Sequence, residues 1–335
     1  MCHNPTTADP DDAPLIMPRN SRYAGQTIDV SNRRSIVIRP TRVIRPTRQR
    51  DELIAPGDAR AIIDYFYHEG KFWSAVMPLD GVAAVYGQAF NFSKMKTRQG
   101  AEGREIVRGK NGLPKRSIPI LNHVQCRFTL RPEFHVGLYP LGDDTNGKPV
   151  DRIRDFVYSA EVVGPAGVAF NIRDGLAGNL LNAHRFLSTR EMVFERIVVE
   201  NQYVTESPAL PIAQSDQREL LVRGLLRSHA AGMTEAYYLY RFCGTNNCTS
   251  NPFRVLDRVV DYRLAQRIGA LLYRMPFNPR LYLRLRGLDA DPSVRKLVRT
   301  EFTEYIRDPG TQRRKRDYVR RQIRARRASR AAANH

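Results

Sequence analysis

Cys248 is the side chain in this sequence best suited to covalent chemistry, because the residues around it predict a turn followed by a helix. The segment before it is rich in tyrosine and apolar residues, and Gly244 and Asn247 then interrupt that pattern. Pro252 is tolerated only in the first turn of a helix, so we expect a helix to begin close to Cys248. The positive end of the helix dipole favours a thiolate, the form of cysteine that attacks a carbonyl carbon. The alternative is a small buried apolar residue, as most free cysteines are.

A cysteine nucleophile needs a base within hydrogen-bond distance and a polar group that orients this base. We expect His123 to be the base, because it opens a predicted strand upstream of Cys248. Two residues remain open for the orienting role: His135, near the start of the next strand, and Glu161, in a third strand. Asn247 either donates a hydrogen bond to an oxyanion or caps the helix. Histidine before cysteine reverses the order in papain and suits a circularly permuted version of the same geometry.

The hydrophobic pattern predicts the sheet that these side chains require. Residues 123–130 alternate in character, and a turn signal at 131–133 leads into a second apolar run at 134–139. Together these segments predict a β-hairpin. Residues 94–115 are glycine-rich and basic, which indicates a loop or flap. Further strands are predicted over residues 156–163 and 192–204, and helices over 56–67, 214–232 and 258–306.

The cysteines give no sign of a disulfide framework. Cys2, Cys126, Cys243 and Cys248 are scattered, and no set of Cys and His residues has the spacing of a zinc site. We therefore expect no metal and no cofactor, and we expect Cys126 to lie in the core. Cys243 and Cys248 are close enough in sequence to pair, and such a bond would remove the reactive thiol.

Most of the net charge of +20 lies in two segments. Residues 31–50 carry seven arginines and no acid, and residues 311–335 carry ten Lys or Arg against one Asp. These segments are predicted to be arms that contact an anionic membrane surface or nucleic acid, with a solvated tail as the alternative. No apolar run approaches the roughly 20 residues needed to cross a bilayer, and no signal peptide is seen. We therefore expect a cytoplasmic or membrane-peripheral protein.

Four short segments resemble a known family: NHVQCRF around His123, SAE at 159–161, FERIVV at 194–199, and YYLYRFCGTNNCTSNPF around Cys248. They are similar to the Lnb-type N-terminal periplasmic domain family, which includes bacterial lipoprotein transacylases and is similar to permuted NlpC-type and lecithin retinol acyltransferase enzymes. The resemblance implies Cys248 as nucleophile, His123 as base and an acyl-thioenzyme intermediate. The acyltransferases imply His135 as the third residue, and the SAE strand implies Glu161. Family members are typically exported or membrane-tethered, which this chain does not show.

The expected architecture is an α+β fold, a papain-like, permuted NlpC-type antiparallel sheet packed on helices, with basic flexible termini. The expected function is a cysteine-dependent hydrolase or acyltransferase acting on an ester or amide, including lipid or lipoprotein substrates. The alternative is a nucleic-acid-binding or structural protein on an inactive scaffold of this type. The expected segments are a disordered basic arm (1–50), a helical extension and flap (51–117), the thiol domain (118–265), a helical extension (266–310) and an Arg-rich tail (311–335).

Overall fold

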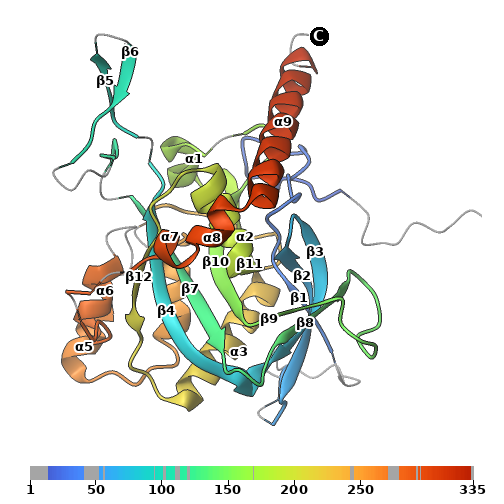
Figure 1. Ribbon diagram of the computed structural model, residues 1–335, viewed down its shortest axis with the longest axis vertical. Helices are drawn as coiled ribbons and strands as arrows, with labels where there is room; N and C mark the ends of the chain where they lie inside the picture. The colour runs from blue at the N-terminus through green and yellow to red at the C-terminus, as the bar shows by residue number, and fades with distance from the viewer. Residues whose placement is uncertain are drawn as a thin grey trace, which may run out of the picture.

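Strands from most of the chain meet in one β-sheet, which positions everything else in the molecule. The computed structural model shows helices on both sides of this sheet (Figure 1). Twelve strands of the described residues join it. The structure describes residues 14–40, 53–55, 57–93, 95–100, 103–109, 114–118, 121–168, 170–241, 245–270, 279–291, 293–294 and 296–332.

The order of strands across the sheet is β14-β12-β4-β7-β10-β11-β2-β3-β8-β9, with β1 attached to β2 and β13 attached to β11. Neighbouring strands are antiparallel except β2 and β11, which pair in parallel. Strands β5 and β6 form a separate hairpin. The strands are β1 (Val37–Arg39), β2 (Arg60–His68), β3 (Lys71–Pro78), β4 (Val82–Asn91), β5 (Thr97–Gly100), β6 (Gly103–Ile106), β7 (Asn122–Leu130), β8 (Val136–Pro140), β9 (Asp151–Ile153), β10 (Asp155–Val163), β11 (Leu180–Ser188), β12 (Thr205–Ala209), β13 (Ala236–Tyr237) and β14 (Lys296–Leu297).

Helices α3 and α4 pack on one face of the sheet, and α2, η4, α8 and α9 lie over the other. The short segment η4 is a π-helix that continues α2. None of the described helices is both long and apolar enough to cross a membrane. The helices are η3 (Leu79–Gly81), α1 (Ile172–Ala177), α2 (Thr189–Val193), η4 (Phe194–Val199), α3 (Gln214–Ala231), α4 (Ser250–Leu256), α5 (Leu264–Ala270), α6 (Pro279–Leu285), α7 (Val298–Glu301), α8 (Thr303–Arg307) and α9 (Pro309–Ala332).

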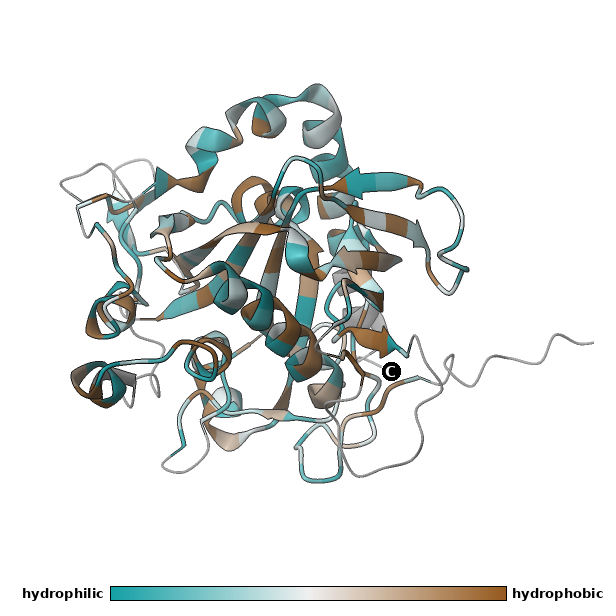
Figure 2. Ribbon diagram, turned by 90° about the horizontal axis from the view of Figure 1, so that it is seen from below, coloured by the Kyte–Doolittle hydropathy of each residue, from teal (hydrophilic) through white to brown (hydrophobic). Residues whose placement is uncertain are grey.

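Alternation along β7 gives the central sheet two chemically different faces. Val124, Cys126 and Phe128 contribute to the apolar core beneath α3 and α4. Figure 2 shows apolar residues in brown along the central strands and on the helices that pack on them. His123 and Arg127, which alternate with them, are buried polar residues that bond to Ser159 and Asp155 of the neighbouring strand β10. The predicted strand at 123–130 is therefore confirmed, and its polar side chains lie on one face of the sheet only.

Three predicted elements are wrong. Residues 56–67 contribute to strand β2 instead of a helix, because their aromatic and β-branched residues pair with β3. The hairpin over 123–139 does not form, because β10, β11, β2 and β3 lie between β7 and β8. Residues 192–204 contain the end of α2 and the π-helix η4 where a strand was expected.

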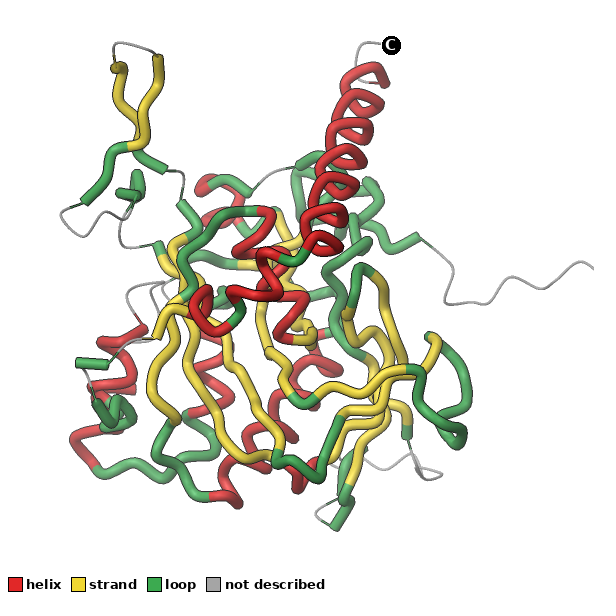
Figure 3. Tube along the Cα trace, in the orientation of Figure 1, coloured by secondary structure: helices red, strands yellow, loops and turns green. Residues whose placement is uncertain are grey.

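The α+β class is confirmed, since a large, mostly antiparallel sheet packs on helices. The thiol domain was predicted to begin at residue 118. Strands on both sides of that residue belong to the same sheet, because β2, β3 and β4 join strands that follow it. Residues 14–40 pack on the body through buried Ile36 and Ile38, so they are no free arm. Residues 1–13 and 41–52 lie outside the described part of the chain. The Arg-rich tail is helical as far as Ala332, and α9 extends away from the body (Figure 3).

Candidate functional site

Cys248 lies in the turn that leads into α4, and hydrogen bonds among its neighbours fix this turn. It is a free cysteine, and Cys243, the partner considered for a disulfide, lies outside the described residues. Tyr238 and Asn246 exchange two backbone hydrogen bonds of 2.8 and 3.2 Å, which close the loop before the turn. The Asn246 side chain also accepts from Asn251 on α4, at 2.8 Å. The fold therefore holds the sulfur in one place at the end of the sheet.

Asn247 anchors the first turn of α4. Its Oδ1 accepts hydrogen bonds from the backbone N–H groups of Thr249 and Ser250, at 2.9 and 2.7 Å. Its Nδ2 donates to the carbonyl of Leu239 at 2.8 Å. Of the two roles considered for Asn247, the geometry therefore favours helix capping, because the side-chain amide that an oxyanion would need is bonded to Leu239.

The thiol of Cys248 is protonated at neutral pH. Burial raises its pKa to about 11, and hydrogen bonding from Tyr237 and Thr249 only partly opposes this effect. The thiol donates to the carbonyl of Asn122 at 4.0 Å, and the Tyr237 hydroxyl lies 3.8 Å from the sulfur. The expectation of a thiolate favoured by the helix is therefore wrong. Helix α4 is short, Asn247 already accepts its first N–H groups, and desolvation of the charged sulfur is the larger effect.

His123 is an oriented, neutral imidazole. Its Nε2 lies 2.8 Å from the hydroxyl oxygen of Ser159, and its ring stacks on Phe90 with centroids 4.7 Å apart. Burial lowers the pKa of His123 to about 3, although the charge of Glu161 opposes the shift. Ser159 therefore has the orienting position that sequence reasoning assigned to His135 or Glu161. The sequence contained a signal for Ser159, because it lies two residues before Glu161 and strand alternation puts both side chains on the same face.

Cys248 and His123 line one cavity of about 840 Å³. The sulfur packs against the backbone on both sides of the histidine, since it contacts the carbonyl of Asn122 and faces the N–H of Val124. The thiol and the imidazole share no hydrogen bond, although both belong to the described residues. Because Nε2 is taken by Ser159, Nδ1 is the ring nitrogen available to a thiol proton.

Glu161 also lines the cavity, but its carboxylate is committed to arginines. Arg33 forms an ion pair with it at 2.9 Å, and Arg185, at 3.3 Å, and Arg196 donate hydrogen bonds to it. Burial alone would raise the pKa of Glu161, yet the three guanidinium groups hold this pKa well below its usual range. The carboxylate makes no hydrogen bond to His123. Its negative charge partly opposes the lowering of the pKa of His123.

His135 does not take part in this site. It immediately precedes β8, which four strands separate from β7, and it is not among the residues that line the cavity. The pKa of His135 is lowered by partial burial and by the charge of Arg152. The predicted hairpin would have brought His135 close to His123, and the observed strand order separates them.

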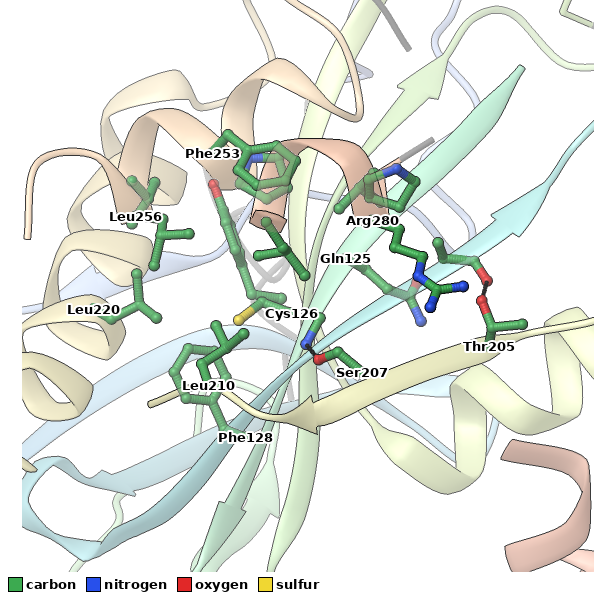
Figure 4. Close-up of a pocket in the computed structure, with 18 residues that line it drawn as sticks. Gln125, Cys126, Phe128, Thr205, Ser207, Leu210, Leu220, Phe253, Leu256 and Arg280 are labelled. Atoms are coloured by element: carbon green, nitrogen blue, oxygen red, sulfur yellow. Dashed lines mark hydrogen bonds between the residues drawn. The ribbon is translucent and has the colours of Figure 1, made fainter. Parts of the chain in front are cut away.

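A second cavity, of about 230 Å³, lies on the opposite face of β7 beneath α4 (Figure 4). Its lining is mostly apolar and contains no histidine. Cys126 lies in this lining, and burial raises the pKa of its thiol to about 12. Cys126 is therefore an unreactive core residue, as expected. Apolar side chains labelled in Figure 4 include Phe128, Leu210, Leu220, Phe253 and Leu256.

No protein-family model, curated protein or solved structure matches this chain. Within the described residues, no group of three or more His, Cys, Asp or Glu side chains is arranged to hold a metal ion. The chemistry of the site must therefore be derived from the geometry of the cavity that Cys248 and His123 share.

Proposed function

We propose that the protein is a cysteine-dependent hydrolase or acyltransferase that uses Cys248 as nucleophile and His123 as base. One observation carries this proposal: a free thiol and an imidazole oriented by a neighbouring hydroxyl line the same cavity. A structural cysteine needs neither an accessible cavity nor an oriented base beside it. The resemblance of the surrounding segments to Lnb-type thiol enzymes agrees with this role.

The resting pair is neutral, so the proton must move during the attack. As the sulfur of Cys248 bonds to the carbonyl carbon of an ester or amide, Nδ1 of His123 accepts the thiol proton and the carbonyl electron pair moves to oxygen. Collapse of this adduct breaks the bond to the leaving group, which takes the proton from His123. Water or an amine then attacks the thioester with His123 again as base. This step releases the acyl group and restores the thiol.

The residues around the pair have defined tasks in this cycle. Ser159 accepts the Nε2–H hydrogen bond of His123 and stabilises the imidazolium that forms. The Tyr237 hydroxyl lies 3.8 Å from the sulfur, and burial raises its pKa well above the usual value, so it stays a hydrogen-bond donor. We assign Tyr237 to the oxyanion. Arg33 and Arg196 also line the cavity, and their charge favours the negative oxygen over the imidazolium.

A nucleic-acid-binding protein on an inactive scaffold is the second candidate, and the exposed arginines of α9 favour it. Phosphate neutralisation by these arginines would give binding that weakens steeply with salt. This candidate predicts that deleting residues 311–335 abolishes nucleic-acid binding and that Cys248→Ala leaves it unchanged.

Covalent labelling with a thiol-directed acyl probe tests the leading proposal. We expect intact-mass spectrometry to show one acyl adduct on the wild-type chain and on Cys126→Ser, which removes a core thiol. We expect the adduct to disappear in Cys248→Ser. An adduct of undiminished yield on Cys248→Ser would place the reactive thiol elsewhere and would refute the proposal.

A further inference from the structure

Helices α3 and α4 border a third cavity, of about 580 Å³, which shares no lining residue with the cavity of Cys248. Four arginines line it, two from α3 and two from the end of α4 and the turn after it. The polar side chains of its lining are Arg223, Arg227, His229, Glu235, Arg254 and Arg258. We call it the basic cavity.

Two of the four arginines already have acidic partners. Arg227 donates to both carboxylate oxygens of Glu235, at 2.6 and 2.5 Å. Burial alone would raise the pKa of Glu235, but hydrogen bonds from Arg227 and Asn246 lower it, so this carboxylate stays charged. Arg223 forms an ion pair with Glu219, one turn earlier on α3, at 2.6 Å.

The other two arginines have no acidic partner. Within the described residues, neither Arg254 nor Arg258 forms an ion pair, and the guanidinium of Arg258 makes no hydrogen bond either. Arg254 donates to the carbonyl of Thr245 and keeps further N–H groups free of protein acceptors. Two positive charges of the cavity are therefore left without a counter-charge.

His229 adds an uncharged hydrogen-bond donor to the lining. Its Nδ1 accepts a hydrogen bond from the backbone N–H of Ile38 at 3.0 Å, so the ring proton is on Nε2. Burial lowers the pKa of His229, and the imidazole is neutral at pH 7. The ring therefore donates through Nε2 without needing an acid beside it.

Apolar side chains form the rest of the basic cavity. They are Leu53, Leu226, Ala230 and Val255. A volume of this size is typical of sites that hold a small organic molecule, which is larger than a single inorganic ion. The cavity therefore combines unneutralised guanidinium groups with an apolar surface.

We propose that the basic cavity binds a small phosphate ester, with its phosphate group at Arg254 and Arg258 and its organic part against the apolar lining. A phosphate monoester has a charge close to −2 at neutral pH, which matches the two unpaired arginines. The fork of a guanidinium group fits phosphate oxygens, and Arg is the usual residue for recognising them.

A purely structural role does not account for this cluster. The C-terminal end of a helix dipole favours a cation, which explains why Arg254 lies at the end of α4. It does not explain three further arginines around the same hollow, because like charges placed together repel each other unless an anion neutralises them. This inference is independent of the proposed thiol chemistry.

Isothermal titration calorimetry of the full-length chain with phenyl phosphate tests the inference. We expect saturable binding of one molecule per chain. We expect Arg258→Glu and Arg223→Glu each to weaken it by about tenfold or more, because each places a negative charge beside the phosphate and removes a charged donor. Arg258 is the sharper site, since its guanidinium makes no contact that the fold would lose.

Arg154→Glu is the matched control. Arg154 is also exposed, forms no ion pair within the described residues and does not line the basic cavity. Weakened binding in both cavity variants with unchanged binding in Arg154→Glu supports the inference. Absence of saturable binding in the wild type overturns it. Equal affinity in the wild type and Arg258→Glu, or an equal loss in Arg154→Glu, would place the anion elsewhere and also overturns it.

Two further comparisons define the ligand and separate it from the enzyme. We expect phenyl phosphate to bind about fivefold or more tightly than inorganic phosphate, because its ring buries apolar surface against Leu226 and Val255. Equal affinities would overturn the assignment to an ester. We expect Cys248→Ala to bind phenyl phosphate as the wild type does. Phosphate binding without labelling of Cys248 by an acyl probe would refute the enzyme and leave this site standing.

Discussion

At the scale of single residues, the site depends on a thiol and an imidazole that are both uncharged. Burial raises the pKa of Cys248 to about 11 and lowers that of His123 to about 3, so an ion pair between them is disfavoured at neutral pH. A substrate carbonyl would therefore have to enter before the proton moves. In the proposed mechanism a bound substrate therefore triggers the proton transfer, and the resting, protonated thiol resists oxidants that need a thiolate.

Ser159 should be a positioning residue for His123. We expect Ser159→Ala to fold normally and to lower the rate of Cys248 acylation, because the imidazolium loses its hydrogen-bond acceptor. The expected loss is about tenfold or more, since one such bond contributes about 1.5–3 kcal/mol to a charged partner. Ser159→Thr, which keeps the hydroxyl, should restore part of the rate. Equal rates in Ser159→Ala and the wild type would show that the hydroxyl has no role in orienting the base.

The sequence was sufficient to predict a helix start beside Cys248 and a strand at His123, because turn chemistry and strand alternation are local signals. That the two residues act as a catalytic pair stays a prediction. The sequence was insufficient to identify the residue that orients His123. The choice between His135 and Glu161 depended on which strands pair, and strand order is set by contacts between distant segments. It also could not show that three arginines neutralise Glu161, since Arg33, Arg185 and Arg196 come from separate parts of the chain.

At the scale of elements, the turn from Asn246 to Asn251 is a hydrogen-bonded connector. The side chain of Asn247 is fully buried and satisfies two N–H groups of α4 and one carbonyl of the preceding loop. The hydrogen bonds of this turn are therefore structural, and within residues 246–251 only Cys248 lines the cavity. These internal hydrogen bonds explain how a polar segment can be buried beside Cys248.

Removal of the Asn247 side chain should destabilise the protein. We expect Asn247→Ala to reduce the free energy of unfolding by about 1–3 kcal/mol, because it leaves buried N–H groups without acceptors. Urea denaturation followed by circular dichroism measures this change. Asn146→Ala is a suitable control, since Asn146 is exposed and bonds only to Asp144 nearby. A loss as small as that of the control would contradict the connector role.

The errors in predicted elements have one physical origin. Residues 56–67 match a helical spacing of apolar residues, but β2 is buried on most of its length and therefore shows no clear alternation. Residues 192–204 look like a strand by composition, yet they form α2 and η4 over the sheet. In both places tertiary packing overrides local preference.

At the scale of the whole molecule, several buried histidines make the fold sensitive to acid. Burial lowers the pKa values of His68, His123 and His184. In the unfolded chain each binds a proton near pH 6.5, whereas the folded protein excludes it until the pH approaches the depressed value, about 3 for His123. Stability should therefore be full above about pH 6.5 and fall as the pH decreases toward 3.

The contribution of His123 to this acid sensitivity can be isolated. We expect the urea midpoint of the wild type to fall between pH 6.5 and pH 4.5, and to fall less steeply in His123→Gln. One such group contributes at most about 1.4 kcal/mol per pH unit. Identical pH dependence in the two proteins would mean that His123 titrates normally in the folded state, contrary to its buried position.

The α+β class could be predicted from the sequence, but the extent of the sheet could not. Strands before and after residue 118 alternate in the sheet, and the parallel pairing of β2 with β11 joins segments more than a hundred residues apart. The basic C-terminal segment was recognised from its charge. Its attachment to the body follows only from the contact of Arg314 with Glu191 and from the packing of Tyr318 on Phe194.

The rate at which an activated, neutral acyl ester modifies Cys248 tests the central claim most directly. Peptide mass spectrometry locates the adduct, and the time course is compared among the wild type, His123→Ala and His135→Ala. We predict that His123→Ala slows acylation of Cys248 by about 10²–10⁴-fold, the usual contribution of a general base, and that His135→Ala leaves the rate unchanged. Equal rates in the wild type and His123→Ala would contradict the claim that the two side chains act as a catalytic pair.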